Sequence, residues 1–259
     1  MSTAPALAGT ALSKTFGGLK AVNNVTFAVP AGSLTALIGP NGAGKTTLFN
    51  LVTNLFPPDT GEVTYFGVPL AHRSPSDIAG LGLLRTFQTA RVFPGMTALE
   101  NVLVGAHRQV KAQAWKQMLW LGAARHEEHR LIEQADALLD LVGLAAFRDT
   151  AATSLPMGAQ KLIEVCRALM ARPRLLLLDE PAAGLNDAET AELAALLRAV
   201  RDTGITIMVV EHNMSLVMNV ADEVIVLDLG SLIARGTPAE VQRDGRVIEA
   251  YLGLEHEAH

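Results

Sequence analysis

The sequence has a single cysteine, Cys166, among its 259 residues, and only 5% of its residues are aromatic. One cysteine cannot form an internal disulfide and has no partners for a metal cluster, so a reducing compartment is expected. No apolar run approaches the roughly 18 to 20 residues that a membrane-spanning helix needs, and the first residues lack the basic and apolar regions of a secretory signal. These absences disfavour a disulfide-stabilised secreted domain and a membrane-embedded chain.

Charge of one sign is not in large excess either, because 21 basic residues face 26 acidic ones and the net charge is -5. This balance disfavours nucleic acid as a partner. Hydrophobic residues make up 49% of the chain and prolines number only 12, which is typical of a folded globular protein. A chain of this length buries roughly three quarters of its unfolded surface, so we expect a large core.

The chain does contain a series of short apolar, β-branched runs bounded by glycine and proline, several of them separated by helix-like stretches. This alternation indicates an α/β fold. The leucines at 175–178 do not alternate with polar residues, which is typical of a central strand in a parallel sheet. Between Thr97 and Arg148 the apolar spacing becomes helical. We expect a helix from Gly158 to Ala171 or Arg172, another that begins after Asp187 and runs to about Asp202, and strands at 25–29, 33–39, 61–66, 174–179, 205–211 and 223–228.

The segment GPNGAGKTT matches the pattern G-x-x-x-x-G-K-T between an apolar strand and a helix expected from about Lys45. Its glycines let the loop curl, so that backbone N–H groups and the helix dipole converge on phosphate oxygens. Lys45 would reach the β- and γ-phosphates, and the Thr46 hydroxyl would ligate Mg²⁺. The alternative is a glycine-rich turn with an unrelated lysine. The nucleotide-binding residues predicted here are Gly39, Pro40, Asn41, Gly42, Ala43, Gly44, Lys45, Thr46 and Thr47.

Two carboxylates follow the leucine run, at Asp179 and Glu180. Asp179 would hold the metal ion through water, and Glu180 would polarise an attacking water. The alternative is an acidic pair that only faces solvent at a strand end. Together with the phosphate loop, the pair indicates a nucleoside triphosphatase, although kinases and GTPases share both features.

Four further elements occur in order: Gln88 in RTFQTARVF, LPMGAQK at 155–161, Gly-Leu-Asn at 184–186, and His212 at a strand end. Together with the loop they resemble the ABC ATPase family over nearly the whole chain. The resemblance implies a P-loop NTPase (RecA-like) core with a mainly parallel sheet, an N-terminal antiparallel β subdomain and an α-helical subdomain. We expect one domain over 1–259, with the core and β subdomain at about 1–96 and 173–259 and the helical subdomain at about 97–172.

The resemblance also implies roles for single residues. Gln88 would contact Mg²⁺ and the attacking water, and His212 would bond the γ-phosphate, so the expected catalytic residues are Glu180, His212 and Gln88. Thr46, Gln88 and Asp179 would hold the metal ion. Phe16 would stack on adenine with Val22 beside it, and such stacking contributes roughly 1 to 3 kcal/mol. A core position is the alternative for Phe16.

The signature segment, which would bind ATP held by a second subunit, departs from the family's Leu-Ser-Gly-Gly-Gln. Pro156 replaces the serine and has neither a side-chain donor nor an N–H. Backbone N–H groups near Gly158 and the helix dipole remain, so we expect a working but weaker site, by about 1.5 to 3 kcal/mol. Asn186 stands where many relatives have Asp. The segment comprises Leu155, Pro156, Met157, Gly158, Ala159 and Gln160.

Longer strings such as RTFQTARVFPGMTALENVLVGAH and LLLLDEPAAGLN closely resemble the branched-chain amino-acid importer ATPases of the LivG type. This resemblance implies an ATP- and Mg²⁺-dependent ATPase on the cytoplasmic face of the membrane, coupled to uptake of branched-chain or related hydrophobic amino acids. Its expected partners are membrane-spanning permease subunits, a second ABC ATPase (a heterodimer, with a homodimer as the alternative) and, indirectly, a substrate-binding protein. The insert at 107–130 would contact a partner or pack in the helical subdomain through Trp115, Met118, Leu119 and Trp120.

Three other functions remain open at this point. A non-transport ABC ATPase acting on nucleic acid or ribosomes normally needs tandem cassettes, a coiled-coil insertion or basic extensions, none of which the sequence contains. The ATPase of a urea or amide importer would share the same motifs. A phosphotransferase would use the same loop but would release a phosphorylated product instead of free phosphate.

Overall fold

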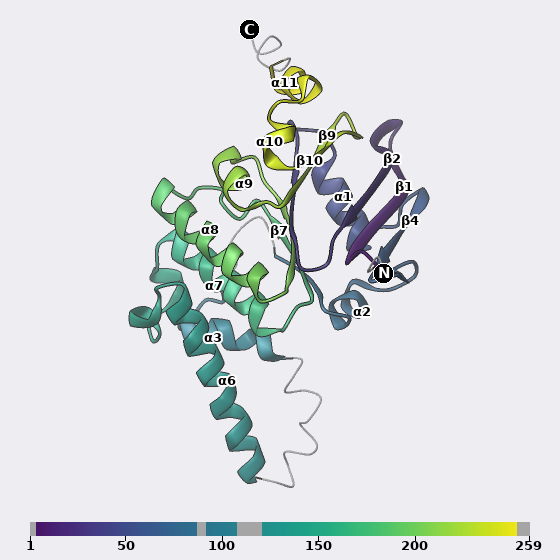
Figure 1. Cartoon of the computed structure of the whole chain (residues 1–259). Helices are drawn as coiled ribbons and strands as arrows, with labels where there is room; N and C mark the ends of the chain where they lie inside the picture. The colour runs from purple at the N-terminus through teal and green to yellow at the C-terminus, as the bar shows by residue number, and fades with distance from the viewer. Residues whose placement is uncertain (1–3, 87–91, 108–120, 253–259) are drawn as a thin grey trace. The chain divides into compact units, whose positions relative to one another are not determined.

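The computed structural model describes residues 4–86, 92–107 and 121–252, and the chain divides into two compact units (Figure 1). The first unit comprises Met1–Arg85, Arg174–Ala183 and Leu197–His259, and the second comprises Thr86–Pro173 and Gly184–Leu196. The sequence boundaries, about 1–96 and 173–259 for the core, differ from this division at 86–96 and 184–196, which belong to the second unit. Within that unit, Glu189 of the 184–196 segment lies against Gly158.

An antiparallel sheet begins the first unit. It consists of β1 (Leu7–Phe16), β2 (Leu19–Val29), β4 (Thr60–Tyr65) and β5 (Val68–Pro69), in the order β2-β1-β4-β5. The register of β1 and β2 runs from Leu7 opposite Val29 to Phe16 opposite Leu19. Gly17 and Gly18 close this hairpin at positive φ, as a tight turn requires. The predicted N-terminal β subdomain is confirmed.

The second sheet of this unit is mainly parallel, in the order β10-β9-β3-β8-β7-β6, and only β9 and β10 pair antiparallel. Every residue of β3, β7 and β8 is buried, as expected for strands covered on both faces. The predicted parallel core is therefore confirmed. The strands are β3 (Leu34–Ile38), β6 (Leu83–Arg85), β7 (Leu175–Asp179), β8 (Thr206–Val210), β9 (Glu223–Asp228) and β10 (Ser231–Gly236).

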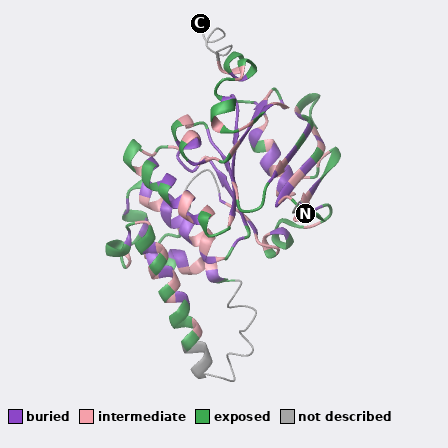
Figure 2. Cartoon of the chain, in the orientation of Figure 1, coloured by how far each residue is buried: buried purple, intermediate pink, exposed green. Residues whose placement is uncertain are grey.

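Helix α1 (Lys45–Val52) packs in one hydrophobic cluster with both sheets. Leu48 and Phe49 of α1 are fully buried there, in the same cluster as alternate residues of the parallel strands such as Leu175 and Leu177. Figure 2 shows buried residues along the strands of this unit. Burial of each such side chain stabilises the fold by about 1.5 to 3 kcal/mol. The cluster thereby fixes the start of α1 at the carboxyl end of β3, where the phosphate loop lies.

Shorter helices complete the first unit: α2 (Pro75–Gly80), α9 (Met214–Val220), α10 (Pro238–Val241) and α11 (Gly245–Leu252). Capping boxes begin two of them, through Ser74 and Asp77 for α2 and through Thr237 and Glu240 for α10. These reciprocal bonds satisfy N–H groups that a helix start leaves without partners. Helix α8 (Asp187–Asp202) contributes residues to both units; it includes Asp187, after which it was predicted to begin, and ends at Asp202 as predicted.

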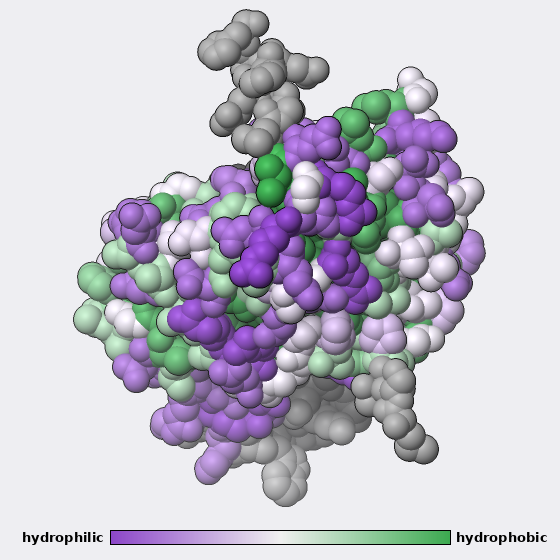
Figure 3. Space-filling model, turned by 45° about the horizontal axis from the view of Figure 1, so that its top comes forward, coloured by the Kyte–Doolittle hydropathy of each residue, from purple (hydrophilic) through white to green (hydrophobic). Residues whose placement is uncertain are grey.

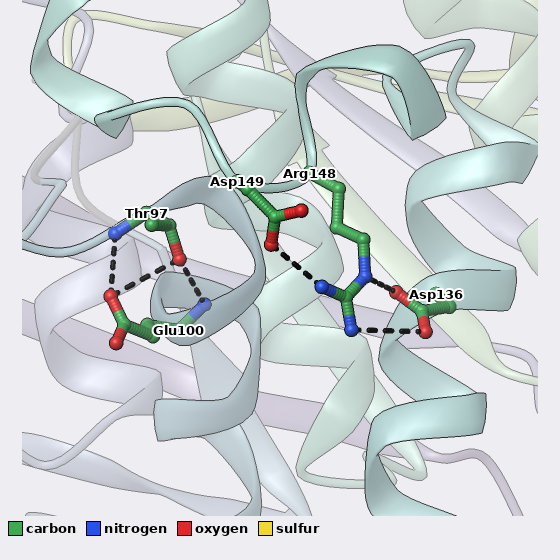
Figure 4. Close-up of polar contacts among 5 residues, drawn as sticks. All are labelled: Thr97, Glu100, Asp136, Arg148 and Asp149. Atoms are coloured by element: carbon green, nitrogen blue, oxygen red, sulfur yellow. Dashed lines mark hydrogen bonds and ion pairs between the residues drawn. The ribbon is translucent and has the colours of Figure 1, made fainter.

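The second unit contains α3 (Ala98–Leu103), α6 (Leu121–Leu141) and α7 (Met157–Met170). Figure 4 shows two of its polar groups: the capping box of Thr97 and Glu100 that begins α3, and Arg148, which bridges Asp136 of α6 and Asp149. Exposed pairs of this kind contribute only about 0 to 1 kcal/mol each. Helix α7 begins one residue before the predicted Gly158 and ends before Arg172, whose φ is 54°.

No helix in the described part of the chain is long and apolar enough to cross a membrane. The longest, α6, has 21 residues and carries Glu127, Glu128 and Arg130. On the face that Figure 3 shows, hydrophilic residues predominate and hydrophobic residues form small groups between them.

Candidate functional site

A pocket of about 470 Å³ lies in the first unit, around the start of α1. It brings the predicted phosphate loop together with Phe16 and Glu180, which come from β1 and from the end of β7. Lys45 also lies in this lining, close to the carboxylate of Glu180. The remaining lining residues are Leu19, Lys20, Ala21, Asn41, Gly42, Ala43, Gly44, Thr46, Thr47 and Leu229.

The curl of the phosphate loop depends on its glycines. Gly44 has φ 97°, and a Cβ there would lie 2.2 Å from the carbonyl oxygen of Ala21. Gly39 is equally confined, because a Cβ there would lie 2.1 Å from the carbonyl oxygen of Leu227. Gly44 is also the N-cap of α1 and has no side chain to cap the helix. The positive end of the helix dipole therefore lies at a pocket wall made of backbone, which favours an anion.

Lys45 is only 8% exposed, and its Nζ donates to the carbonyl oxygens of Gly39 (2.7 Å) and Pro40 (2.8 Å). Burial lowers the pKa of Lys45, whereas the carboxylates of Glu180 and Asp179 raise it. The ammonium is thus held by two neutral acceptors inside a confined loop. An anionic oxygen would be a stronger acceptor for the same donor.

Asp179 ends β7 and is 6% exposed. Its Oδ2 accepts a 2.7 Å bond from Nη2 of Arg85, and Nη1 of Arg85 donates to Oδ1 of Asn50 at 2.6 Å. One guanidinium therefore joins β6, β7 and α1. Arg85 is not among the site residues predicted from the sequence, although its charge at the end of the apolar strand LGLLR is a signal that points to it.

Glu180 and His212 follow β7 and β8, which are adjacent strands. Their side chains approach to 3.9 Å between Oε2 of Glu180 and Nδ1 of His212. Glu180 has φ 48°, a left-handed conformation that side-chain-bearing residues rarely adopt and that tends to occur at functional sites. Two of the three predicted catalytic residues thus lie together, and the third, Gln88, lies outside the described residues.

Phe16 lies at the rim of the pocket with 45% of its surface exposed, and its ring packs edge-on against Phe56 at 5.4 Å between centroids. It is therefore placed to offer a face to a planar group. The side chain of Val22 is fully buried in the hydrophobic cluster and does not line the pocket, whereas Leu19, Lys20 and Ala21 do. The place of Val22 beside the adenine stays a prediction.

The signature segment begins α7 in the second unit. Pro156 is the N-cap, with φ −55° and ψ 155°, and gives no side-chain cap. Nε2 of Gln160 donates to the carbonyl oxygen of Leu155 at 2.8 Å, which tethers the first turn. Met157 is 53% exposed, and a Cβ on Gly158 would collide with Glu189. The insert residues Trp115, Met118, Leu119 and Trp120 lie outside the described residues.

The donors near the loop fit Mg²⁺ better than a cage-bound metal. Among the described residues, no group of three or more His, Cys, Asp or Glu is arranged to hold a metal ion. The hydroxyl of exposed Thr46 and the carboxylate of Asp179 offer oxygen donors of the kind that Mg²⁺ prefers. Mg²⁺ commonly uses one or two such groups together with water and phosphate oxygens. The sparse donor set is consistent with a metal ion that arrives with a nucleotide.

Replacing Arg85 with Met is expected to destabilise the chain by about 3 kcal/mol, because it leaves the buried Asp179 carboxylate without its partner. The side chains of this pair are 18% and 7% exposed. Arg148→Met is the matched control, since its pair with Asp136 is 36% and 40% exposed and should matter by about 0 to 1 kcal/mol. Urea unfolding measures both, and equal losses would contradict the role of Arg85.

Two family models match the chain. One described as "ABC transporter" matches residues 22–183, and one described as "Branched-chain amino acid ATP-binding cassette transporter" matches residues 231–257. The chain is 40% identical over 250 residues to the "High-affinity branched-chain amino acid transport ATP-binding protein BraF" of Pseudomonas aeruginosa, covering 96% of this chain and 98% of that one. LivG of Salmonella typhimurium, with the same description, matches at 40% identity and the same coverage.

Solved structures agree with these matches. The ADP conformation of an ATP-binding cassette of an ABC transporter superimposes with a TM-score of 0.83 at 32% identity, covering 97% of this chain and all (100%) of that one. A nucleotide-free ATP-binding cassette from an ABC transporter superimposes with a TM-score of 0.81 at 31% identity, covering 95% of this chain and 98% of that one. The phosphate loop, the paired β7 and β8 ends and the family matches agree, and the chain belongs to the ABC transporter family as an ATP-binding cassette.

Proposed function

We propose that this cassette hydrolyses ATP in the pocket at the start of α1 and that hydrolysis drives import of branched-chain or related hydrophobic amino acids. The observation that carries the hydrolytic part is the 3.9 Å approach of Glu180 to His212 beside the phosphate loop. The substrate class rests on relatives whose descriptions name branched-chain amino-acid transport.

The nucleotide would lie with its base against Phe16 and its phosphates at the start of α1. Phe16 would stack on the adenine, while Lys45 and the first backbone N–H groups of α1 would hold the phosphates. Thr46 and Asp179, together with Gln88, would hold Mg²⁺, which when bound offsets phosphate charge. Because the pocket walls near the phosphates are mostly backbone and Lys45, affinity would depend on the triphosphate more than on the base.

Hydrolysis would depend on Glu180, which would accept a proton from the attacking water or orient it. His212 would bond the γ-phosphate from the adjacent loop, and Gln88 would complete the catalytic group. A positioned proton acceptor typically contributes 10²- to 10⁴-fold to a rate. Glu180 has a left-handed backbone conformation and lines the pocket, where an attacking water would lie.

The site would be completed in trans by the signature segment of a second ABC ATPase, in a heterodimer with a related chain. ATP can favour closure of such a pair only by binding the closed form more tightly than the open one, so the contacts shared between subunits would couple hydrolysis to movement. The chain would lie on the cytoplasmic face of the membrane, bound to permease subunits and served by a substrate-binding protein.

Reconstitution of the chain with its permease subunits, partner ATPase and binding protein tests this function. Leucine, isoleucine or valine should stimulate phosphate release, because the loaded binding protein favours the closed pair. Stimulation by urea or amides alone would point to that importer class instead. A phosphorylated product in place of free phosphate would indicate a phosphotransferase.

Pro156→Ser is expected to raise hydrolysis by the assembled transporter about tenfold, because a serine hydroxyl would add one bond to a charged phosphate group, worth about 1.5 to 3 kcal/mol. Serine would also cap α7, which lacks a side-chain cap. Pro156→Ala is the matched control, because it removes the ring without adding a hydroxyl. Equal activities of the two variants would contradict a role for the hydroxyl.

A further inference from the structure

Glu211 directly follows β8 and is completely buried, at 0% exposure. Carboxylates are almost never fully buried unless their oxygens are bonded. Here they are: Oε1 accepts from the backbone N–H of Ala182 at 2.7 Å, and Oε2 accepts from those of His212 and Asn213, each at 3.1 Å. Among the described residues, both oxygens of this carboxylate thus accept from backbone N–H groups only.

These three donors lie on two different loops. Ala182 belongs to the loop that leaves β7 through Glu180, and His212 and Asn213 belong to the loop that leaves β8. The loops start side by side, since Asp179 pairs with Val210 in the parallel register. Glu211 thus spans the two chain segments that carry the proposed base and the proposed γ-phosphate ligand.

The backbone of Glu180, close to the bonds made by Glu211, has a left-handed conformation that neighbouring residues must stabilise. Glu180 adopts φ 48°, and its N–H donates to the carbonyl oxygen of Val210 at 2.9 Å. A left-handed residue with a side chain persists only where its surroundings hold it. The bond from Ala182 to Glu211 holds the loop two residues beyond Glu180, and the bonds from His212 and Asn213 hold the other loop.

We propose that Glu211 is a positioning residue that fixes the separation of Glu180 and His212 by joining their loops through one buried carboxylate. Glu211 itself touches neither nucleotide nor water in this role, because it does not line the pocket and has no exposed surface. This inference rests on the proposed hydrolysis. It adds Glu211, a buried carboxylate outside the pocket lining, to the acidic residues Asp179 and Glu180 on which that reaction would depend.

The variant Glu211→Gln distinguishes a positioning role of Glu211 from a role in core packing alone. Glutamine has the same shape as glutamate, but its amide nitrogen is a donor and would face a backbone N–H on one of the two sides. Either Ala182 or the pair His212 and Asn213 then loses its acceptor. In Glu211→Gln, one of the two loops would therefore lose its hydrogen bond to residue 211, while the volume of the side chain in the core stays the same.

The test uses the full chain assembled with its transporter partners. In Glu211→Gln, kcat for ATP should fall roughly 10- to 100-fold, the effect of displacing a reacting group by about 1 Å. ATP affinity should stay within about twofold, because Lys45, Phe16 and α1 are not bonded to Glu211. Glu211→Asp keeps the charge but shortens the reach, so its kcat should be intermediate. Circular dichroism and thermal unfolding show whether each variant is folded.

A second readout distinguishes positioning from a structural role. If Glu211 acts through Glu180, adding Glu211→Gln to Glu180→Gln should lower kcat by less than about twofold further, because effects of groups that act as one unit are not additive. A merely structural defect would lower activity again in the double variant and weaken ATP binding as well.

An unchanged kcat in folded Glu211→Gln would overturn the inference. If that variant does not fold, Glu211→Asp decides, and a wild-type kcat there would also overturn it. These results are distinct from failure of the proposed function, in which Glu180→Gln alone would retain full hydrolysis.

Discussion

Replacing Glu180 with Gln is expected to leave ATP binding within about twofold while lowering hydrolysis by roughly 100-fold or more. Glutamine keeps the size of the side chain and its reach into the pocket, which Glu180 lines at 23% side-chain exposure. It cannot accept a proton, however. Because Lys45, the loop N–H groups and Phe16 are unchanged, the binding contacts survive and only the chemical step is affected.

The measurement pairs phosphate release at saturating ATP with ATP binding by calorimetry. Glu62→Gln is the matched control, because Glu62 lies exposed on β4 of the same unit and its loss of charge should change neither quantity. Undiminished phosphate release from Glu180→Gln would remove Glu180 from the mechanism. A proportional loss of binding would instead assign Glu180 to nucleotide affinity.

Lys45→Met is expected to weaken ATP binding by at least roughly 30-fold, since losing one member of a buried charged pair costs about 2 to 5 kcal/mol. Lys45 is almost fully buried at the start of α1, and its ammonium lies inside the phosphate loop, where it donates to the carbonyl oxygen of Gly39. Met has a similar length and shape, so the position stays filled.

Lys20→Met provides the control for this second variant. Lys20 also lines the pocket, but its side chain is exposed, and an exposed charge contributes only about 0 to 1 kcal/mol. Its ATP affinity should therefore change by less than about fivefold. Calorimetric titration of both variants at one salt concentration would compare them directly, and equal affinities would contradict the special role of the buried lysine.

Elements that depend on residues close together in the chain could be predicted from the amino-acid sequence. Leucines at 175–178 predicted a buried central strand, and the glycines of the loop predicted backbone that curls around phosphate, because each pattern is read within a few residues. The observed strand Leu175–Asp179 and helix start at Lys45 agree with these predictions. The order of the remaining motifs indicated the family, which the comparisons show.

Contacts between side chains that are far apart in the sequence became visible only in the folded chain. Val22 and Ala21 are neighbours, yet one is buried in the core and the other lines the pocket, since register sets which face each residue takes. Arg85 and Asp179 are 94 residues apart and pair because β6 and β7 are adjacent. The same is true of Glu211 and Ala182, 29 residues apart. Such contacts depend on strand order and burial, which a local pattern does not contain.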